Sequence, residues 1–167
     1  MSVEVQQTIN RLPELERLLN DLGELEVTMG YNLPDASRTY ANGTNVATVA
    51  AAHVFGVPGE LPQRDFMRTG IMAGEREIVA SSVKALGAAF DRLGGAEQAL
   101  GEIAQTGAQT ILDRLKTTQQ WAEPIKDETA ERKGNATPLF QDGLLRDTIT
   151  GVVRKGSGIV RTERPRG

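Results

Sequence analysis

A run of turn-forming residues places the firmest limit on how this chain folds. Gly56, Pro58, Gly59 and Pro62 stand close together, and neither a helix nor a strand can continue through this combination of glycine and proline. An apolar segment at 46–54 precedes the run, and a long helical pattern follows it. The chain must therefore cross a surface loop between two regular elements.

Apolar residues at spacings of three and four predict three helices. The first covers residues 12–23, because Pro13 is tolerated in a first helical turn. The second covers residues 71–93 and ends at Gly94-Gly95, a C-cap pair. The third covers residues 100–115, and the short link before it predicts an antiparallel helical pair laid across a sheet.

Two glycines, Gly101 and Gly107, stand within the third helical pattern. Each lowers the intrinsic stability of a helix by roughly 1 kcal/mol relative to alanine. Because glycine has no side chain, we expect this face of the helix to allow the close approach of a partner.

Alternation of polar and apolar residues predicts strands. Residues 24–31 alternate as a half-buried strand does. Periodicity alone leaves 46–54 as either a buried strand or a helical segment, and Asn42-Gly43 can make the tight reversal that pairs it with 24–31. A second hairpin turns at 156–158. We expect an α+β fold in which a four-stranded antiparallel sheet is packed by an N-terminal helix and a long antiparallel helical pair, with extended loops or arms.

The length and composition indicate one domain. A chain of 167 residues suits a single core, so we expect one domain at 1–162 and a basic tail at 163–167. The absence of cysteine excludes disulfides, thiolate zinc sites and cysteine nucleophiles, and suits assembly in a reducing cytoplasm. No apolar run approaches the roughly 18 residues of a membrane span, and residues 1–10 do not resemble a signal peptide.

The segment at 117–137 is polar apart from Trp121 and Ile125. It is either a surface loop pinned by Trp121 or an extended arm that settles on a neighbouring subunit. Gln141-Asp142 is then expected to cap a short helical turn at 143–146.

No residue pattern here predicts catalysis. His53 is the sole histidine, whereas zinc needs three or four ligands. Ser81-Ser82 lack the Gly-x-Ser-x-Gly nucleophile elbow, and no glycine-rich phosphate loop occurs. We therefore expect neither an enzyme nor a metal or cofactor site. Arg64, Phe66, Met67 and Arg68 instead form the mixture that is enriched in protein interfaces.

Four motifs resemble the tail-completion, or neck, proteins of tailed bacteriophages. Three are read as His-x-Phe-Gly-x-Pro at 53–58, Leu-Pro-x-Arg-x-Phe-Met-Arg at 61–68 and TPLFQDGLLRDTITGVV at 137–153. The fourth is the connector WAEPIKDETAERKG at 121–134. The overall resemblance extends over most of the chain from about Leu12 to Thr162. Asp65 stands where the family usually has a second proline, and this replacement should loosen the loop. Gln141-Asp142 stands where the family more commonly has Asp-Thr.

The resemblance implies a structural virion protein that forms a ring, usually a hexamer, at the head-tail junction. Its implied partners are other copies of itself, a tail terminator or tail tube protein, and a head connector or stopper protein. DNA would pass through the lumen without specific binding, and assembly would take place in the host cytoplasm without a membrane. The residues expected to contact neighbours are Phe55, Leu61, Arg64, Phe66, Met67, Arg68, Trp121, Arg146 and Asp147, although Arg146 and Asp147 could instead fix the turn before a strand.

The charge distribution supports a second hypothesis, a DNA-associated accessory protein. The net charge is -3, but residues 154–167 carry five cations against Glu163, which is +4 and leaves -7 for residues 1–153. Such a basic end either reaches for phosphate or an acidic neighbour, or is only a solvated tail. A DNA reader normally displays a clustered basic face, whereas the predicted helices carry mixed charge.

Overall fold

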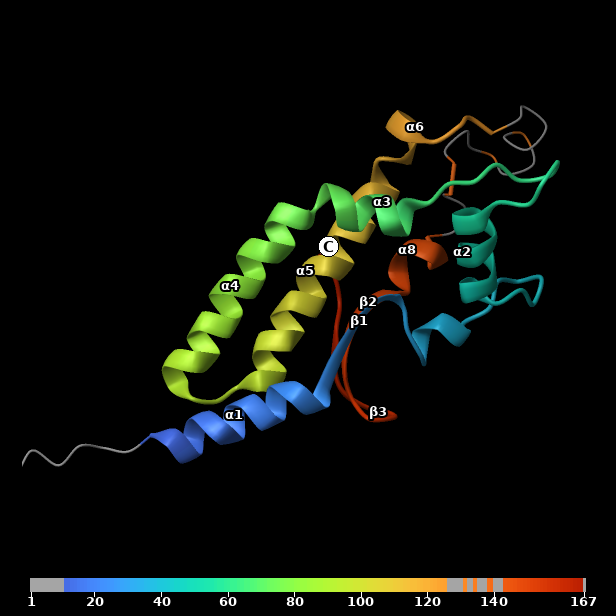
Figure 1. Cartoon of the computed structure of the whole chain (residues 1–167). Helices are drawn as coiled ribbons and strands as arrows, with labels where there is room; N and C mark the ends of the chain where they lie inside the picture. Colours follow the sequence, from blue (N-terminus) through green and yellow to red (C-terminus); the bar gives the residue numbers. More distant parts are fainter. Residues whose placement is uncertain (1–10, 126–130, 132–133, 135–137, 140–142, 167) are drawn as a thin grey trace, which may run out of the picture.

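The computed structural model describes residues 11–125, 131, 134, 138, 139 and 143–166. Within these residues the chain is α+β, with helices around a three-stranded antiparallel sheet (Figure 1). The strands are β1 (Leu25–Tyr31), β2 (Ile149–Lys155) and β3 (Gly158–Glu163). The helices are α1 (Leu12–Glu24), α2 (Val46–Phe55), α3 (Phe66–Ala73), α4 (Glu75–Arg92), α5 (Ala96–Lys116), α6 (Thr118–Trp121) and α8 (Leu144–Asp147), with a 3-10 turn, η1 (Asp35–Ser37).

The sheet joins segments that are far apart in the sequence. β2 is the central strand and pairs antiparallel with β1, so that Leu25 lies opposite Lys155 and Tyr31 opposite Ile149. On its other side β2 pairs antiparallel with β3. The predicted strand at 24–31 and the second predicted hairpin are therefore present.

The predicted fourth strand is wrong, because residues 46–55 form helix α2. The Asn45 side-chain oxygen accepts hydrogen bonds from the Ala47 and Thr48 backbone N–H groups at 2.7 and 3.3 Å. Asparagine is a preferred N-cap, and three consecutive alanines from residue 50 to 52 favour a helix over a strand. The turn at Asn42-Gly43 exists, with the Gly43 N–H donating to the Tyr40 carbonyl oxygen at 2.9 Å, but it leads into this helix.

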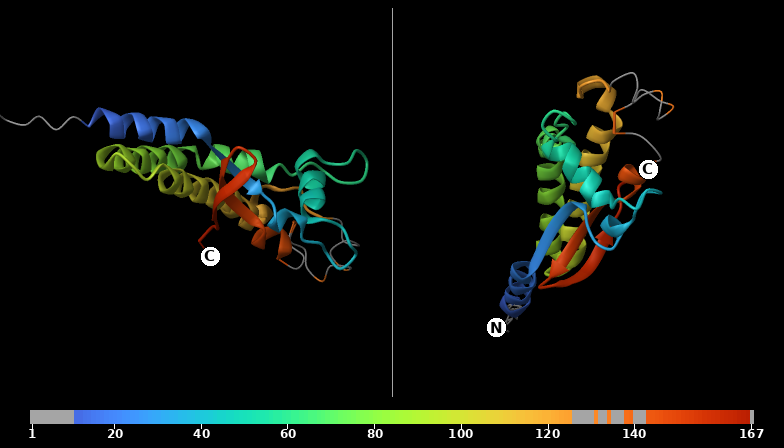
Figure 2. Two further views of the ribbon diagram at one scale, coloured as in Figure 1. Left: turned by 90° about the horizontal axis from the view of Figure 1, so that it is seen from below. Right: turned by 90° about the vertical axis from the view of Figure 1, so that its right-hand side faces the viewer.

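Helix α5 lies along one face of the sheet, and α4 runs back along it as the predicted antiparallel helical pair (Figure 2). Glycines permit the close approach of α5 to the sheet. A Cβ atom at Gly107 would overlap Met29 of β1, and one at Gly151 of β2 would overlap the Ala104 backbone of α5. The partner expected for the glycine face of this helix is thus the chain's own sheet.

The long helix predicted at 71–93 is interrupted at Gly74. Helix α3 ends at Ala73 and α4 begins at Glu75, and a Cβ atom at Gly74 would overlap the side chain of Thr110 on α5. The break lets both helices pack against α5.

Two apolar clusters make up the core. The larger one lies between α2, α3, α5 and β2, and its buried residues include Val46, Phe66, Ile111, Leu145 and Ile149. The smaller one joins α1 to the far end of the α4 and α5 pair. Its buried residues are Leu18, Ala85, Ala89, Ala96 and Ala99.

Candidate interaction surface

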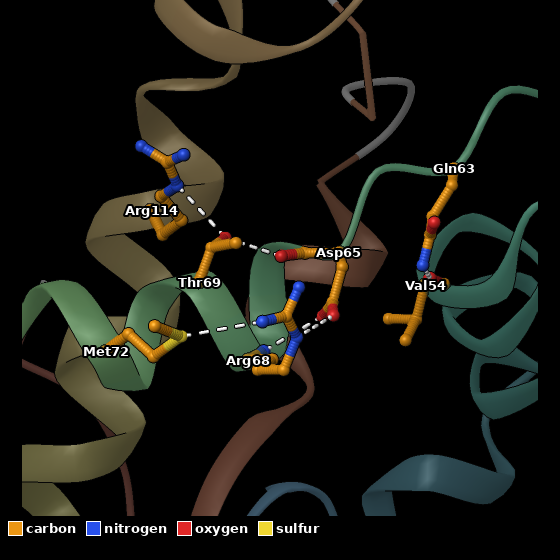
Figure 3. A network of polar contacts seen from close by, with 7 residues as sticks. All are labelled: Val54, Gln63, Asp65, Arg68, Thr69, Met72 and Arg114. Atoms are coloured by element: carbon orange, nitrogen blue, oxygen red, sulfur yellow. Dashed lines mark hydrogen bonds and ion pairs between the residues drawn. The ribbon is translucent and has the colours of Figure 1, made fainter.

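The predicted loop after α2 is closed by backbone hydrogen bonds. Val57 and Leu61 exchange two N–H···O bonds of 2.8 Å each, and Gln63 Nε2 donates to the Val54 carbonyl oxygen at 3.0 Å (Figure 3). Gly56 ends α2 with a φ of 73°, a left-handed conformation that glycine adopts without strain. The loop is therefore a small structured hairpin.

Asp65 fixes the start of α3. One carboxylate oxygen accepts from the Arg68 backbone N–H at 2.9 Å and the other from Arg68 Nε at 2.8 Å (Figure 3). The Asp65 carbonyl oxygen accepts from Thr69 Oγ1, which in turn accepts from Arg114 Nε at 3.1 Å. An aspartate N-cap satisfies backbone donors of the first helical turn. The expectation that Asp65 loosens this loop is therefore wrong.

Arg64 and Phe66, both expected to contact neighbours, face the interior of the chain. Arg64 is 3% exposed and donates through Nε and Nη2 to the Glu123 carbonyl oxygen at 3.3 and 2.9 Å. Burial lowers the pKa of Arg64, and the charge of Glu123 opposes that shift. Phe66 is 0% exposed, and its ring meets that of Tyr31 edge-on with 6.2 Å between centroids. Both side chains stabilise the fold and present no surface to a neighbour.

The other predicted contact residues of this segment differ in exposure. Phe55, at the end of α2, is 76% exposed. Leu61 and Met67 are half-buried, and Arg68 is exposed but paired with Asp65. Phe55 is therefore the residue of this group with most apolar surface available to a partner.

Trp121 is held against α5. Its Nε1 donates to the Arg114 carbonyl oxygen at 2.9 Å, and the Arg114 guanidinium lies 4.2 Å from the ring centroid. Up to Ile125 the segment is thus held on its own chain by Trp121, as in the first of the two alternatives, and does not extend as an arm. Most of residues 126–137, including the predicted connector to Gly134, lie outside the described residues.

Arg146 and Asp147 lie on α8, directly before β2. Arg146 Nε is 2.7 Å from Asp147 Oδ1, and this pairing raises the pKa of Arg146. The Asp147 N–H donates to the Gly143 carbonyl oxygen at 2.9 Å, while both side chains are exposed. The backbone fixes the turn and the side chains face solvent, so the two roles expected for them do not exclude each other. Gln141-Asp142, the expected cap, lies outside the described residues.

The basic C-terminal end is attached to the body of the protein. Glu163 ends β3 instead of beginning a tail. Arg164 pairs with Asp35 at 2.8 Å, and its carbonyl oxygen accepts from Gln105 Nε2 at 3.0 Å. Two further ion pairs join Lys155 to Glu24 at 2.6 Å and Arg161 to Glu163 at 2.5 Å. This pairing leaves less positive charge for phosphate than the sequence suggests.

The residues considered for catalysis have structural partners. Thr106 Oγ1 donates to Ser81 Oγ at 2.9 Å, and Ser82 Oγ donates to the Ile78 carbonyl oxygen at 2.8 Å. The His53 carbonyl oxygen accepts from the Arg64 N–H at 2.7 Å. Among the described residues, no group of three or more histidine or acidic side chains is placed to hold a metal ion. No helix in that part of the chain combines the length and apolarity needed to cross a membrane.

An exposed apolar stripe on α4 was missed by the sequence prediction. Val79, Val83 and Phe90 are exposed, Val83 to 70%, and their spacing places them on one face of the helix. Ala85 and Ala89 instead form the packed face of α4. The helical spacing of Val79, Val83 and Phe90 suggested that they face the core. The alanines, and not these larger residues, mark the face of α4 that packs on the core. We refer to Val79, Val83 and Phe90 as the α4 stripe.

A shallow apolar groove lies between β1 and α3. It has a volume of about 400 Å³, and three of the chain's four methionines are among its lining residues. We refer to it as the methionine groove, lined by Val27, Met29, Met67, Arg68, Ile71, Met72 and Ile111. Methionine side chains adapt to partners of different shape, which suits a binding surface.

Comparison of the chain with protein-family models, with curated proteins and with solved structures returned no match. The features of this chain that bear on its function are therefore its sequence motifs and the exposed surfaces described above.

Proposed function

We propose that this protein is a structural component of a phage neck, where copies of it close into a ring at the head-tail junction. The α4 stripe is the observation that carries the proposal. Exposed apolar side chains that gather on one face mark interaction sites on otherwise polar surfaces, and Val79, Val83 and Phe90 are 56%, 70% and 40% exposed. The motifs that resemble tail-completion proteins supply the class of assembly.

The position of the exposed apolar residues suits a head-to-tail contact. A ring needs a heterologous interface, in which one surface of a copy meets a different surface of the next. Helix α4, which carries the α4 stripe, and helix α2, which ends at Phe55, lie on opposite sides of the molecule (Figures 1 and 2). A contact between the α4 side of one copy and the α2 side of the next would bury both.

The resemblance supports a hexamer that joins the tail terminator or tail tube to the head connector or stopper. The proposed place of the protein is the virion neck, after assembly in the host cytoplasm. A net charge of -3 and the ion pairs at the C-terminal end suit a lumen that lets DNA pass without holding it.

Native mass spectrometry tests the ring, first on the protein alone and then after mixing with isolated phage tails. We expect one fixed multiple of the chain to form, with or without tails. Val83→Lys should abolish it, because a charge is placed in the α4 stripe. Ala80→Lys is the matched control, since it adds the same charge at an exposed position of α4 outside the stripe. Equal assembly of both variants would contradict the proposed interface.

The same samples test the DNA-associated alternative. A protein that ignores tails but shifts duplex DNA in a salt-dependent way at physiological ionic strength would have an electrostatic DNA-binding function. That result would overturn the neck proposal. We expect no such shift, because Lys155, Arg161 and Arg164 are already paired with carboxylates.

A further inference from the structure

The end of α2 and the loop after it form an exposed apolar knob. Phe55 is 76% exposed and Val57 is 37% exposed, and the Glu60 N–H donates to the Val57 carbonyl oxygen at 3.0 Å. The loop projects beyond α2 (Figure 1). Because its backbone is already hydrogen-bonded, the loop loses little conformational freedom when it binds a partner. We refer to residues 55–60 as the knob.

The methionine groove has the properties of a receptor for such a knob. Six of its seven lining residues are apolar, and Arg68 is the one that carries a charge. The volume of the groove, about 400 Å³, lies within the roughly 300 to 1,000 Å³ of pockets that hold ligands. Met72 is 62% exposed, and methionine sulfur makes favourable contacts with aromatic rings. The groove therefore suits a phenylalanine side chain.

Glu60 of the knob and Arg68 of the groove have complementary charges. Arg68 Nε is paired with Asp65 at 2.8 Å, and Arg68 Nη1 lies 3.5 Å from Met72 Sδ (Figure 3). Arg68 Nη2 makes no hydrogen bond with a described residue, so the guanidinium can bind a second carboxylate. Glu60 is exposed and forms no ion pair within the described part of the chain. Charge complementarity of this kind fixes the register of an interface.

The groove does not receive the knob of its own chain. Phe55 and Val57 are exposed, and neither of them lines the groove. The segment that connects the knob to α3 is anchored by Arg64, which is buried. The knob and the groove are thus held apart within one copy, and a knob reaches the groove only from another copy.

The groove adjoins the α4 stripe. Met72 stands seven residues before Val79 in the sequence, a distance of about 10 Å along two successive helices. The groove and the stripe therefore form one apolar surface on the α3 and α4 side of a copy. In the proposed ring, this is the side that faces α2 of the neighbour.

We propose that the knob of one copy inserts into the methionine groove of the next, with Phe55 and Val57 against its methionines and the Glu60 carboxylate paired with Arg68. This joint rests on the proposed function, because it connects the copies of the proposed ring. Each copy gives one knob and receives one, as head-to-tail closure requires. The sequence motif at 53–58 contains Phe55, and the motif at 61–68 contains Arg68, so the two motifs supply the two halves of the joint.

Engineered disulfides test the joint, because the chain has no cysteine of its own. We expect the double variant Val57→Cys with Met72→Cys to form a ladder of covalent multimers on oxidation, seen on a non-reducing gel. A mixture of the two single variants should give covalent dimers only, because each copy then carries one half of the joint. Each single variant alone controls for pairing between identical sites.

Val57→Cys with Ala73→Cys is the matched control. Ala73 is exposed on α3 directly after Met72, but it does not line the groove. The ladder of this variant should therefore be much fainter. Ladders of equal strength from the two double variants would overturn the insertion of the knob into the groove.

Phe55→Ala tests the joint without added cysteines. It should raise the protein concentration at which half of the chains assemble by more than about tenfold, because an aromatic anchor of the interface is lost. Native mass spectrometry over a dilution series measures this concentration. An unchanged value would overturn the role of Phe55 in the joint.

The outcomes for the joint and for the neck function can be told apart. A ring seen by native mass spectrometry in which the Val57 and Met72 variants do not cross-link would overturn the joint and leave the ring intact. A ladder from a protein that ignores phage tails would support the joint and count against the neck function. A chain that neither cross-links nor assembles would overturn both.

Discussion

The guanidinium of Arg114 lies over the indole ring of Trp121, while Trp121 Nε1 donates a hydrogen bond to the carbonyl oxygen of Arg114. The two residues thereby hold the short helix α6 against the end of α5. Arg114 also donates to Thr69 Oγ1 on α3, so three helices meet at this contact.

Arg114→Ala should loosen this junction. Trp121 is the sole tryptophan, so its fluorescence reports the contact alone, and we expect its emission to shift to longer wavelength. The loss of the cation-π contact should lower the free energy of unfolding by about 0.5 to 1 kcal/mol, measured by urea titration. Lys116→Ala, at an exposed position of the same helical turn, is the control. Identical spectra for the two variants would contradict the contact.

Two phenylalanines allow one chemical change to be compared in two environments. Phe66→Ala removes a fully buried ring and should lower the free energy of unfolding by about 3 to 5 kcal/mol. Phe55→Ala removes a ring that is 76% exposed, and should change the stability of the single chain by less than about 1 kcal/mol. Thermal or urea unfolding of unassembled chains measures both. Equal losses of unfolding free energy in the two variants would contradict the buried position of Phe66.

Glycine-to-alanine substitutions test how closely α5 approaches the sheet. Alanine in a helix or a strand is usually favoured over glycine by about 0.5 to 1 kcal/mol. Gly151→Ala, on β2, should nevertheless be destabilising, because its Cβ atom would overlap the Ala104 backbone of α5, which cannot move aside as a side chain can. Gly87→Ala, on α4, has no atom within 4 Å of the new Cβ and should be stabilising. If both variants are more stable than the wild type, α5 lies further from β2 than described.

Alkaline pH should destabilise the fold through Tyr31. Its hydroxyl donates to the Leu145 carbonyl oxygen at 2.9 Å. Burial of the hydroxyl is the main cause that raises the pKa of Tyr31, and the electrostatic interaction with Tyr40 raises it further. An unfolded tyrosine ionises near pH 10, at which the folded chain keeps the proton. The stability is therefore fully present below about pH 10 and falls as the pH rises above it.

Tyr31→Phe should weaken this pH dependence, because it removes the ionisable group. The measurement is the urea midpoint at about pH 9 and about pH 11, on either side of the usual tyrosine pKa. We expect the midpoint of the wild type to fall further between these values than that of the variant. A parallel decline would mean that another group causes the alkaline loss of stability.

Local signals in the sequence were enough to predict several elements. Pro13 marked the first turn of α1, the alternation from residue 24 to 31 marked β1, and Gly94-Gly95 marked the end of the helix before α5. Each of these depends on backbone chemistry within a few residues.

One error came from a local signal that the sequence prediction did not use, and the others from tertiary contacts. The run at 46–54 is apolar enough for a strand or a helix, and the adjacent N-cap Asn45 decided for the helix. At the break, Gly74 packs so closely on Thr110, which is distant in sequence, that a Cβ atom there would overlap the Thr110 side chain. Arg64 and Phe66 have the composition of an interface, yet their burial against Glu123 and Tyr31 could not be inferred from composition.

The wide separation of β1 and β2 in the sequence has a consequence for the newly made chain. Asn32, which directly follows β1, donates to the Thr150 carbonyl oxygen of β2, 118 residues later. At synthesis rates of about 5 to 20 residues per second, β2 is synthesised on the order of 10 s after β1. Both edges of β1 are open on the ribosome during that time. We therefore expect chaperone supply and growth temperature to affect the yield of folded chains more than they affect their final stability.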